Sequence, residues 1–226
     1  MCIRDRYGVT PEIREIGPIT PIAQGGDSVD TGKGSLPGSL GGLVRDANNT
    51  RYFLTCDHVV GRLAGRNVND PVYSGGSQIG NFAKGGTVNM MSGARNRIDA
   101  ALISLLNPTA HLTSIRGIGS VKGTAFWSHG VRVDKYGAQT SQTTGDYVYT
   151  VSHRVPYSVG TALFVDQIGV DSLRASPFAD AGDSGSLVLD QNGNVGGLIF
   201  ASAVNSNLGF ANPIHDVLQH FGVAFV

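Results

Sequence analysis

The chain has 226 residues, and its 17 basic residues balance its 17 acidic ones, so it carries no formal net charge at pH 7. This balance argues against a nucleic-acid or anionic-membrane surface, because such surfaces need an excess of clustered Lys and Arg. Hydrophobic residues make up 41% of the chain, and no apolar run approaches the roughly 18 residues of a membrane span. The 32 glycines are about twice the usual share and predict many turns and short strands.

The first 24 residues are predicted to form an extended arm, because Pro, Gly and isolated Ile recur there without a sustained period. Residues 1–7 (MCIRDRY) are polar and resemble an artefactual extension. They contain no apolar stretch of a secretory signal, so a cytoplasmic location is the default expectation. Cys2 and Cys56 are too few for a disulfide framework.

Short apolar runs bounded by turn residues follow in quick succession and predict β-strands. The one good helix signal is C-terminal, with Asn212 as N-cap and Pro213 at the first helical position. A polar, glycine-containing stretch at 107–123 separates two strand-rich halves. Such a pattern predicts an all-β sandwich or barrels. The predicted strands are 42–45, 51–55, 77–82, 98–105, 131–136, 147–153, 162–170, 186–189 and 196–201.

Three short segments carry the chemistry: TCDHV at 55–59, NRIDAAL at 96–102 and AGDSGSL at 181–187. A serine hydroxyl becomes a nucleophile only when a base within hydrogen-bond reach takes its proton, and imidazole suits that role at neutral pH. A buried carboxylate then orients the imidazole and stabilises its protonated form. The glycines beside the serine allow backbone N–H groups to face a developing oxyanion.

The candidate catalytic residues are therefore His58, Asp99 and Ser184, with the N–H groups of Gly182 and Ser184 as oxyanion donors. Each residue taken alone has an ordinary explanation: a surface or core histidine, a capping aspartate, a turn serine. Their joint occurrence in the order His, Asp, Ser, each beside a predicted strand, favours acyl transfer.

These motifs resemble those of chymotrypsin-fold (trypsin-like) serine peptidases, with TCDHV, IDAALISL and GDSGS as the matching blocks. More closely, the chain is similar to bacterial trypsin-like peptidases related to the plant narrow-leaf protease. The resemblance extends from about residue 25 to the C-terminus, and it is carried by 38–46 (GSLGGLVRD), 133–145 (VDKYGAQTSQTTG), 178–190 (FADAGDSGSLVLD) and 195–214 (VGGLIFASA…GFANPI).

The resemblance implies two antiparallel six-stranded β-barrels, at 25–115 and at 116–226, the second ending in the short helix. It places His58 and Asp99 in the first barrel and Ser184 in the second. A peptide or protein substrate is expected to lie between the barrels as an added strand.

The strand that would receive this substrate corresponds to Phe200, Ala201 and Ser202. The position of the pocket floor, six residues before the serine, is occupied by Phe178. Its apolar side chain predicts a shallow pocket for small or apolar groups and disfavours Arg or Lys. Asp180 is close enough that a slip of two in the alignment would bring an acid there.

Two departures from the family pattern concern the candidate acid and base. Asp57 stands where a small residue usually precedes the histidine; it is not expected to orient His58, but its charge would raise the pKa of His58. Phe200 stands where many relatives have a serine that supports the acid, so Asp99 is expected to be held differently. Cys56 has no cysteine nearby and is expected to pack as a buried thiol.

In bacterial relatives an internal cation pairs with the acid before the serine. Lys135 or Arg132 is the candidate partner of Asp183 here; the alternative is a solvated surface lysine.

The predicted function is that of a serine endopeptidase that needs no cofactor and no metal. A catalytically silent pair of barrels that binds peptides or partners is the main alternative, and esterase activity is a third. The six histidines lack the H-x-x-x-H spacing of a metal hydrolase, and GGDSVDTGKGS lacks the spacing of a phosphate-binding loop. The sequence makes no prediction of oligomeric state.

Overall fold

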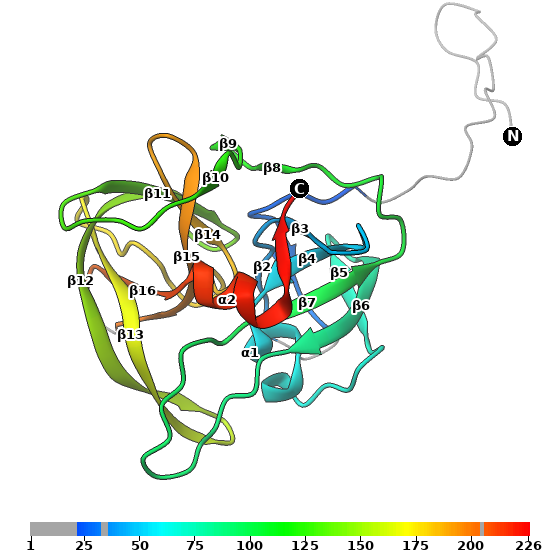
Figure 1. Ribbon diagram of the computed structural model, residues 1–226, viewed down its shortest axis with the longest axis horizontal. Coiled ribbons are helices and arrows are strands. Elements are labelled where there is room, and N and C mark those ends of the chain that lie inside the picture. Colours follow the sequence, from blue (N-terminus) through cyan, green and yellow to red (C-terminus); the bar gives the residue numbers. More distant parts are fainter. Residues whose placement is uncertain (1–21, 33–35, 204–205) are drawn as a thin grey trace, which may run out of the picture.

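The computed structural model describes residues 22–32, 36–203 and 206–226. Most of the predicted N-terminal arm, including residues 1–7 and Cys2, lies outside the described residues. The described chain is mainly antiparallel sheet in two bodies that lie side by side (Figure 1). The predicted all-β class, with a chymotrypsin-type pair of barrels and a short C-terminal helix, is confirmed.

The first sheet has six strands in the order β17-β3-β4-β7-β6-β5. Several of its strands carry runs of buried residues, such as Phe53–Thr55 in β4 and Ala101–Ile103 in β7, so this part of the sheet is covered on both faces. The sixth strand, β17, comes from the end of the chain and pairs with β3, with Ala224 opposite Arg45. The strands are β3 (Leu43–Asp46), β4 (Arg51–Thr55), β5 (Pro71–Ser74), β6 (Ser77–Gly85), β7 (Ala101–Leu105) and β17 (Val223–Phe225).

The second sheet has seven strands in the order β10-β15-β14-β11-β12-β13-β16, and an additional pairing of β15 with β16 joins six of them into a ring. The seventh, β10, runs parallel to β15 at its edge. The strands are β10 (Gly123–Thr124), β11 (Arg132–Gly137), β12 (Ser141–Tyr157), β13 (Gly160–Ser172), β14 (Leu187–Asp190), β15 (Asn194–Ser202) and β16 (Leu208–Pro213).

Strand β12 is much longer than the predicted 147–153, and β13 extends two residues beyond each end of the predicted 162–170. The two strands form a hairpin that extends beyond its barrel. Figure 1 shows this hairpin beside the loop that joins β6 to β7. Asn96 of that loop bridges to Phe164 of β13. The hairpin therefore links the second barrel to the first.

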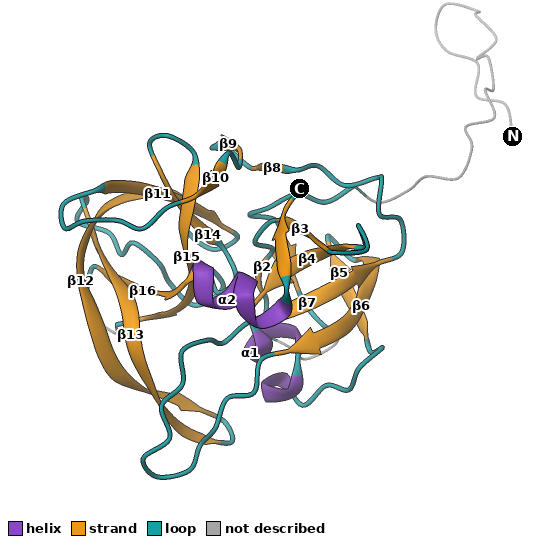
Figure 2. Ribbon diagram, in the orientation of Figure 1, coloured by secondary structure: helices purple, strands orange, loops and turns teal. Residues whose placement is uncertain are grey.

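In the described residues, helix is confined to three short segments, drawn in purple in Figure 2. They are α1 (Asp57–Val60), the 3₁₀ turn η1 (Arg62–Ala64) and α2 (Ile214–Phe221). The predicted C-terminal helix is present, but its N-cap is Pro213; Asn212 lies in β16 with its side chain buried. Among the described helices, none has the length and apolar content to cross a membrane.

Four two-residue strands form two separate small sheets: β1 (Ser28–Val29) pairs with β2 (Gly38–Ser39), and β8 (Ser114–Ile115) with β9 (Gly119–Ser120). One core cluster contains buried residues of both barrels, and a smaller one, around Val133, lies within the second barrel. The division at residues 115 and 116 stays a prediction.

Candidate active site

The pairing of β4 with β7 brings two of the candidate residues together. These strands are antiparallel with Thr55 opposite Ala101, so the residues after β4 lie beside the residues before β7. Helix α1 follows β4 and carries His58, while Asp99 lies two residues before the first residue of β7. His58 Nδ1 and Asp99 Oδ2 are 2.6 Å apart.

The Asp99 carboxylate is fully buried and accepts hydrogen bonds on both oxygens. Oδ1 accepts the backbone N–H groups of Asp57 (2.9 Å) and His58 (3.1 Å). Oδ2 accepts His58 Nδ1 and the hydroxyl of Tyr157, which is 2.7 Å away. A carboxylate has about four acceptor sites, so the environment of Asp99 satisfies an ionised group without water.

The electrostatics follow from these contacts. Burial acts to lower the pKa of His58, but the charge and hydrogen bond of Asp99, with the charge of Asp57, raise this pKa above its ordinary value. Burial acts to raise the pKa of Asp99, but His58 and Tyr157 hold it below its usual value. The pair therefore joins an ionised carboxylate to an imidazole of increased basicity.

Asp57 does not orient the His58 ring. Its carboxylate accepts the backbone N–H groups of Leu63 (2.9 Å) and Arg62 (3.3 Å), at the 3₁₀ turn that follows α1. Burial, with the charge of Asp99, raises the pKa of Asp57 to about 6. As predicted, Asp57 acts on the pKa of His58 through its charge and makes no hydrogen bond to the ring.

Ser184 lies in the turn before β14. Its neighbours Gly182 (φ 108°) and Gly185 (φ 101°) adopt backbone conformations that favour glycine. A Cβ on Gly185 would lie 2.1 Å from Ser39 O and 2.4 Å from Thr55 Oγ1, and the Ser39 N–H donates to Ser184 O at 2.7 Å. The turn therefore packs against the end of β4, immediately before the helix that carries the histidine.

The Ser184 hydroxyl donates to Phe200 O at 3.5 Å. Within the described chain, no hydrogen bond joins this hydroxyl to His58, so the structure brings the third candidate to the site without that bond. The backbone N–H groups of Gly182 and Ser184 have no acceptor among the described residues. They are therefore available to a bound oxygen atom.

The turn is held by a buried ion pair between its Asp183 and Lys135 of β11. Lys135 Nζ lies 3.0 Å from Asp183 Oδ2, and both side chains have 0% exposure. Asp183 also accepts the N–H groups of Gln139 and Thr140, each at 3.0 Å. Burial acts to raise the pKa of Asp183, but the charge of Lys135 and the hydrogen bonds from Thr140 and Asp180 together hold this pKa below its usual value. Of the two predicted partners, Lys135 is the one that pairs; Arg132 binds Asp146.

Replacing Lys135 by methionine is expected to reduce the free energy of unfolding by about 3–5 kcal/mol at neutral pH, because it leaves a buried carboxylate without its cation. A carboxyl group with a depressed pKa stabilises the fold above that pKa, and the contribution is lost as pH falls through it. The deficit should therefore shrink toward acid pH. Urea unfolding at several pH values measures it.

Arg132→Met is the matched control, since its pair with Asp146 is largely exposed and should contribute at most about 1 kcal/mol. Equal stability of the two variants at neutral pH would contradict the assignment of the buried pair.

The predicted substrate-binding strand is the end of β15. Ala201 pairs with Phe210, and Ser202 with Gly209, both of β16. On its other side, β15 pairs with β14 only as far as Leu198. Ala201 and Ser202 thus have a strand neighbour on one side only among the described strands, which leaves an edge beside Ser184 where an extended chain can pair.

A cavity of about 440 Å³ opens beside this edge. Phe178, the predicted pocket floor, is fully buried in the core of the second barrel, and residues around it line the cavity instead. Asp180 is the charged residue among them, and most of the others are small. The lining residues are Ala175, Pro177, Ala179, Asp180, Ser202, Ala203, Ser206 and Asn207.

Cys56, His58 and Asp99 each bring one potential metal-ligating atom within 4.8 Å of the others. Each of these atoms already has a protein partner: Cys56 Sγ donates to Ile199 O at 3.1 Å, and the other two bind each other. Burial raises the pKa of the Cys56 thiol well above its ordinary value. These contacts suit a pair, His58 and Asp99, that transfers protons, with Cys56 packed beside it as a protonated thiol.

Sequence reasoning missed the second barrel's support for Asp99. The Asp99 N–H donates to Asn212 Oδ1 at 2.8 Å, and Asn212 Nδ2 donates to Gln167 Oε1 at 2.6 Å. Tyr157, at the end of β12, donates to the carboxylate itself. The available signal was Phe200, which stands where many relatives have a serine that supports the acid. It indicated that another residue holds Asp99, but it did not show which one.

The sequence matches no protein-family model and no curated protein. Among solved structures, the chain is similar to the Nocardiopsis protease NAPase (18% identity, TM-score 0.68, covering 90% of this chain and 98% of that one). It is similar to Thermobifida fusca protease A (20%, 0.68, 91% and 99%) and to Cellulomonas bogoriensis chymotrypsin (20%, 0.65, 91% and 98%). At these identities the likeness establishes the fold, a chymotrypsin-type double barrel.

Proposed function

We propose that this chain of chymotrypsin-type fold is a serine endopeptidase that acts through His58, Asp99 and Ser184. The observation that carries the proposal is the bond between His58 and the buried, fully hydrogen-bonded Asp99 carboxylate, beside the glycine-flanked turn of Ser184. The similar solved structures support it, because those proteins are proteases by name. The finer assignment, to bacterial peptidases related to the plant narrow-leaf protease, rests on the sequence motifs alone.

The proposed reaction follows the geometry. The Ser184 hydroxyl rotates from Phe200 O toward His58, a change between staggered rotamers, and attacks the substrate carbonyl as His58 Nε2 takes its proton. Asp99 stays ionised and holds Nδ1–H throughout. The N–H groups of Gly182 and Ser184 bind the oxyanion.

The tetrahedral intermediate then expels the amine, which takes the proton back from His58, and an acyl group remains on Ser184. Water, deprotonated by His58, attacks this ester, and collapse of the second intermediate returns the proton to the serine and releases the acid. Every proton in this sequence passes through His58, so no cofactor or metal is required.

The absence of a His58–Ser184 hydrogen bond is the observation that favours the alternative, a silent barrel pair that binds peptides. Such bonds are often long before substrate binds, and the unoccupied N–H groups of Gly182 and Ser184 suit a working site. We therefore place the peptidase first.

Incubation with a mixture of unblocked peptides, followed by mass spectrometry, tests the proposal. We expect internal cleavage by the protein and none by Ser184→Ala. The small residues around the 440 Å³ cavity lead us to expect cleavage after small side chains; cleavage confined to Arg and Lys would assign the selectivity to Asp180 instead. Peptide binding without cleavage would support the silent alternative and overturn the peptidase.

A further inference from the structure

Among the described residues, Tyr157 supplies the one hydrogen bond from the second barrel to the Asp99 carboxylate. This carboxylate accepts four hydrogen bonds. Three come from Asp57 and His58, the first two residues of α1, and the fourth comes from the Tyr157 hydroxyl. The Tyr157 bond ends on Oδ2, the same oxygen that accepts His58 Nδ1. The tyrosine is thus placed to fix that oxygen relative to the imidazole.

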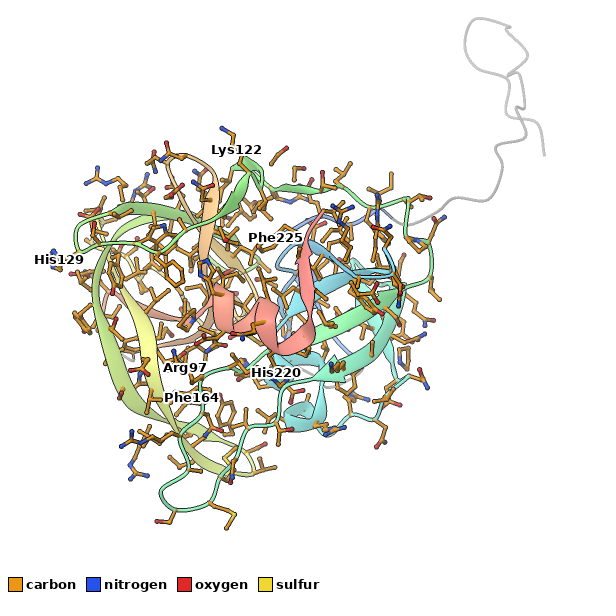
Figure 3. The ribbon with its side chains drawn as sticks, in the orientation of Figure 1. Arg97, Lys122, His129, Phe164, His220 and Phe225 are labelled. Atoms are coloured by element: carbon orange, nitrogen blue, oxygen red, sulfur yellow. The ribbon has the colours of Figure 1, made fainter. Side chains whose placement is uncertain are left out.

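The β12–β13 hairpin delivers this hydroxyl from outside its own barrel. The Asn96 N–H donates to Leu163 O at 2.9 Å, and the Val165 N–H donates to Asn96 O at 2.9 Å. The Asn96 side chain adds a bond from Nδ2 to Leu163 O at 3.1 Å. Phe164 and Arg97 are labelled in Figure 3 near the place where the hairpin meets this loop. The hairpin is therefore clamped to the loop that leads into Asp99.

Aromatic packing sets the direction of the phenol. The ring centroids of Tyr157 and Phe164 are 6.3 Å apart, and those of Phe164 and Phe200 are 4.7 Å apart. The Tyr157 ring also lies 5.9 Å from the ring of His58. Phe200 therefore fills space at the position where the resemblance places a serine, and Tyr157 supplies a hydroxyl to the acid from another element.

We propose that Tyr157 is a positioning residue of the site, one whose hydroxyl holds Asp99 Oδ2 and so sets the orientation of His58. This inference rests on the proposed function for its effect on turnover, but not for its effect on the histidine. Burial, with the charge of Asp99, raises the pKa of the phenol, so it remains a proton donor throughout the working pH range.

The test compares Tyr157→Phe, which removes the hydroxyl and keeps the ring, with Tyr147→Phe. Tyr147 lies on the same strand and its hydroxyl bonds Thr150 Oγ1 at 2.9 Å, at an exposed site. The first readout is the pKa of His58, from NMR titration of protein with ¹⁵N-labelled histidine, with His58→Ala to assign the signal.

Loss of the Tyr157 donor leaves more negative charge on Oδ2, which stabilises protonated His58. We expect its pKa to rise by about 0.5–1 unit in Tyr157→Phe and to stay unchanged in Tyr147→Phe. The other titratable groups facing the pair are Cys56 and Asp57, which are common to all the proteins compared.

The second readout is turnover against pH. In Tyr157→Phe we expect kcat to fall about tenfold with KM unchanged, and the acidic limb of kcat to move to higher pH with the pKa of His58. An unchanged His58 pKa in Tyr157→Phe would overturn the inference. A raised pKa in a protein that cleaves no peptide would uphold the positioning role and overturn the peptidase proposal instead.

Discussion

Ser184→Ala is expected to lower kcat for peptide hydrolysis by about 10⁶-fold, because the serine and histidine act as one unit and neither attacks the carbonyl alone. Progress curves on a cleaved peptide measure it. Ser120→Ala is the matched control, since Ser120 is exposed on β9 and lies outside the site; it should keep full activity.

His58→Ala should reduce kcat by a similar factor, and the double variant should be no slower than either single one. Additive losses would mean that the two residues act independently, which would contradict a shared proton transfer. A Ser184→Ala protein that keeps more than a small fraction of activity would place the nucleophile elsewhere.

Asp99→Asn is expected to reduce kcat by about 10⁴-fold. The asparagine has nearly the same shape, but its amide lacks the charge that stabilises protonated His58 and can stabilise the wrong tautomer of the ring. Since the Asp99 charge raises the pKa of His58, this pKa should fall in the variant. The acidic limb of kcat should therefore move to lower pH, opposite to the shift expected for Tyr157→Phe.

Kinetics of Asp99→Asn across the pH range, with a parallel titration of His58, separate these effects. Asp216→Asn is the control, because Asp216 pairs with Arg97 at the surface. A loss of activity in Asp99→Asn without any change in the His58 pKa would show that the carboxylate does not act through the imidazole.

Much of the site could be predicted from the sequence because its parts are local. A strand that ends at Thr55 and another that begins near Asp99 are visible as apolar runs, and antiparallel pairing then brings His58 and Asp99 together. The turn of Ser184 is marked by its two glycines. Lys135 was one of two candidate partners of Asp183, with Arg132, that the resemblance to bacterial peptidases suggested.

Other features depend on contacts between residues far apart in the chain. Asn212 was interpreted as a helix cap, and no local pattern shows that β16 carries its side chain to Asp99. The reach of β12 and β13 past their barrel, which delivers Tyr157, depends on the clamp at Asn96. The burial of Phe178 depends on how the second core is packed. The periodicity of apolar residues indicates which side chains are buried, but it does not indicate which distant residue each of them contacts.

Covalent labelling with a fluorophosphonate tests the central claim most directly, because the probe reacts only with an activated serine. Intact-mass measurement should show one label per molecule, none on Ser184→Ala or His58→Ala, and full labelling of His220→Ala, which alters an exposed residue of α2. Peptide mapping should place the label on Ser184. A well-folded protein that takes up no label, or takes it up equally in the Ser184→Ala variant, would contradict the proposed serine peptidase.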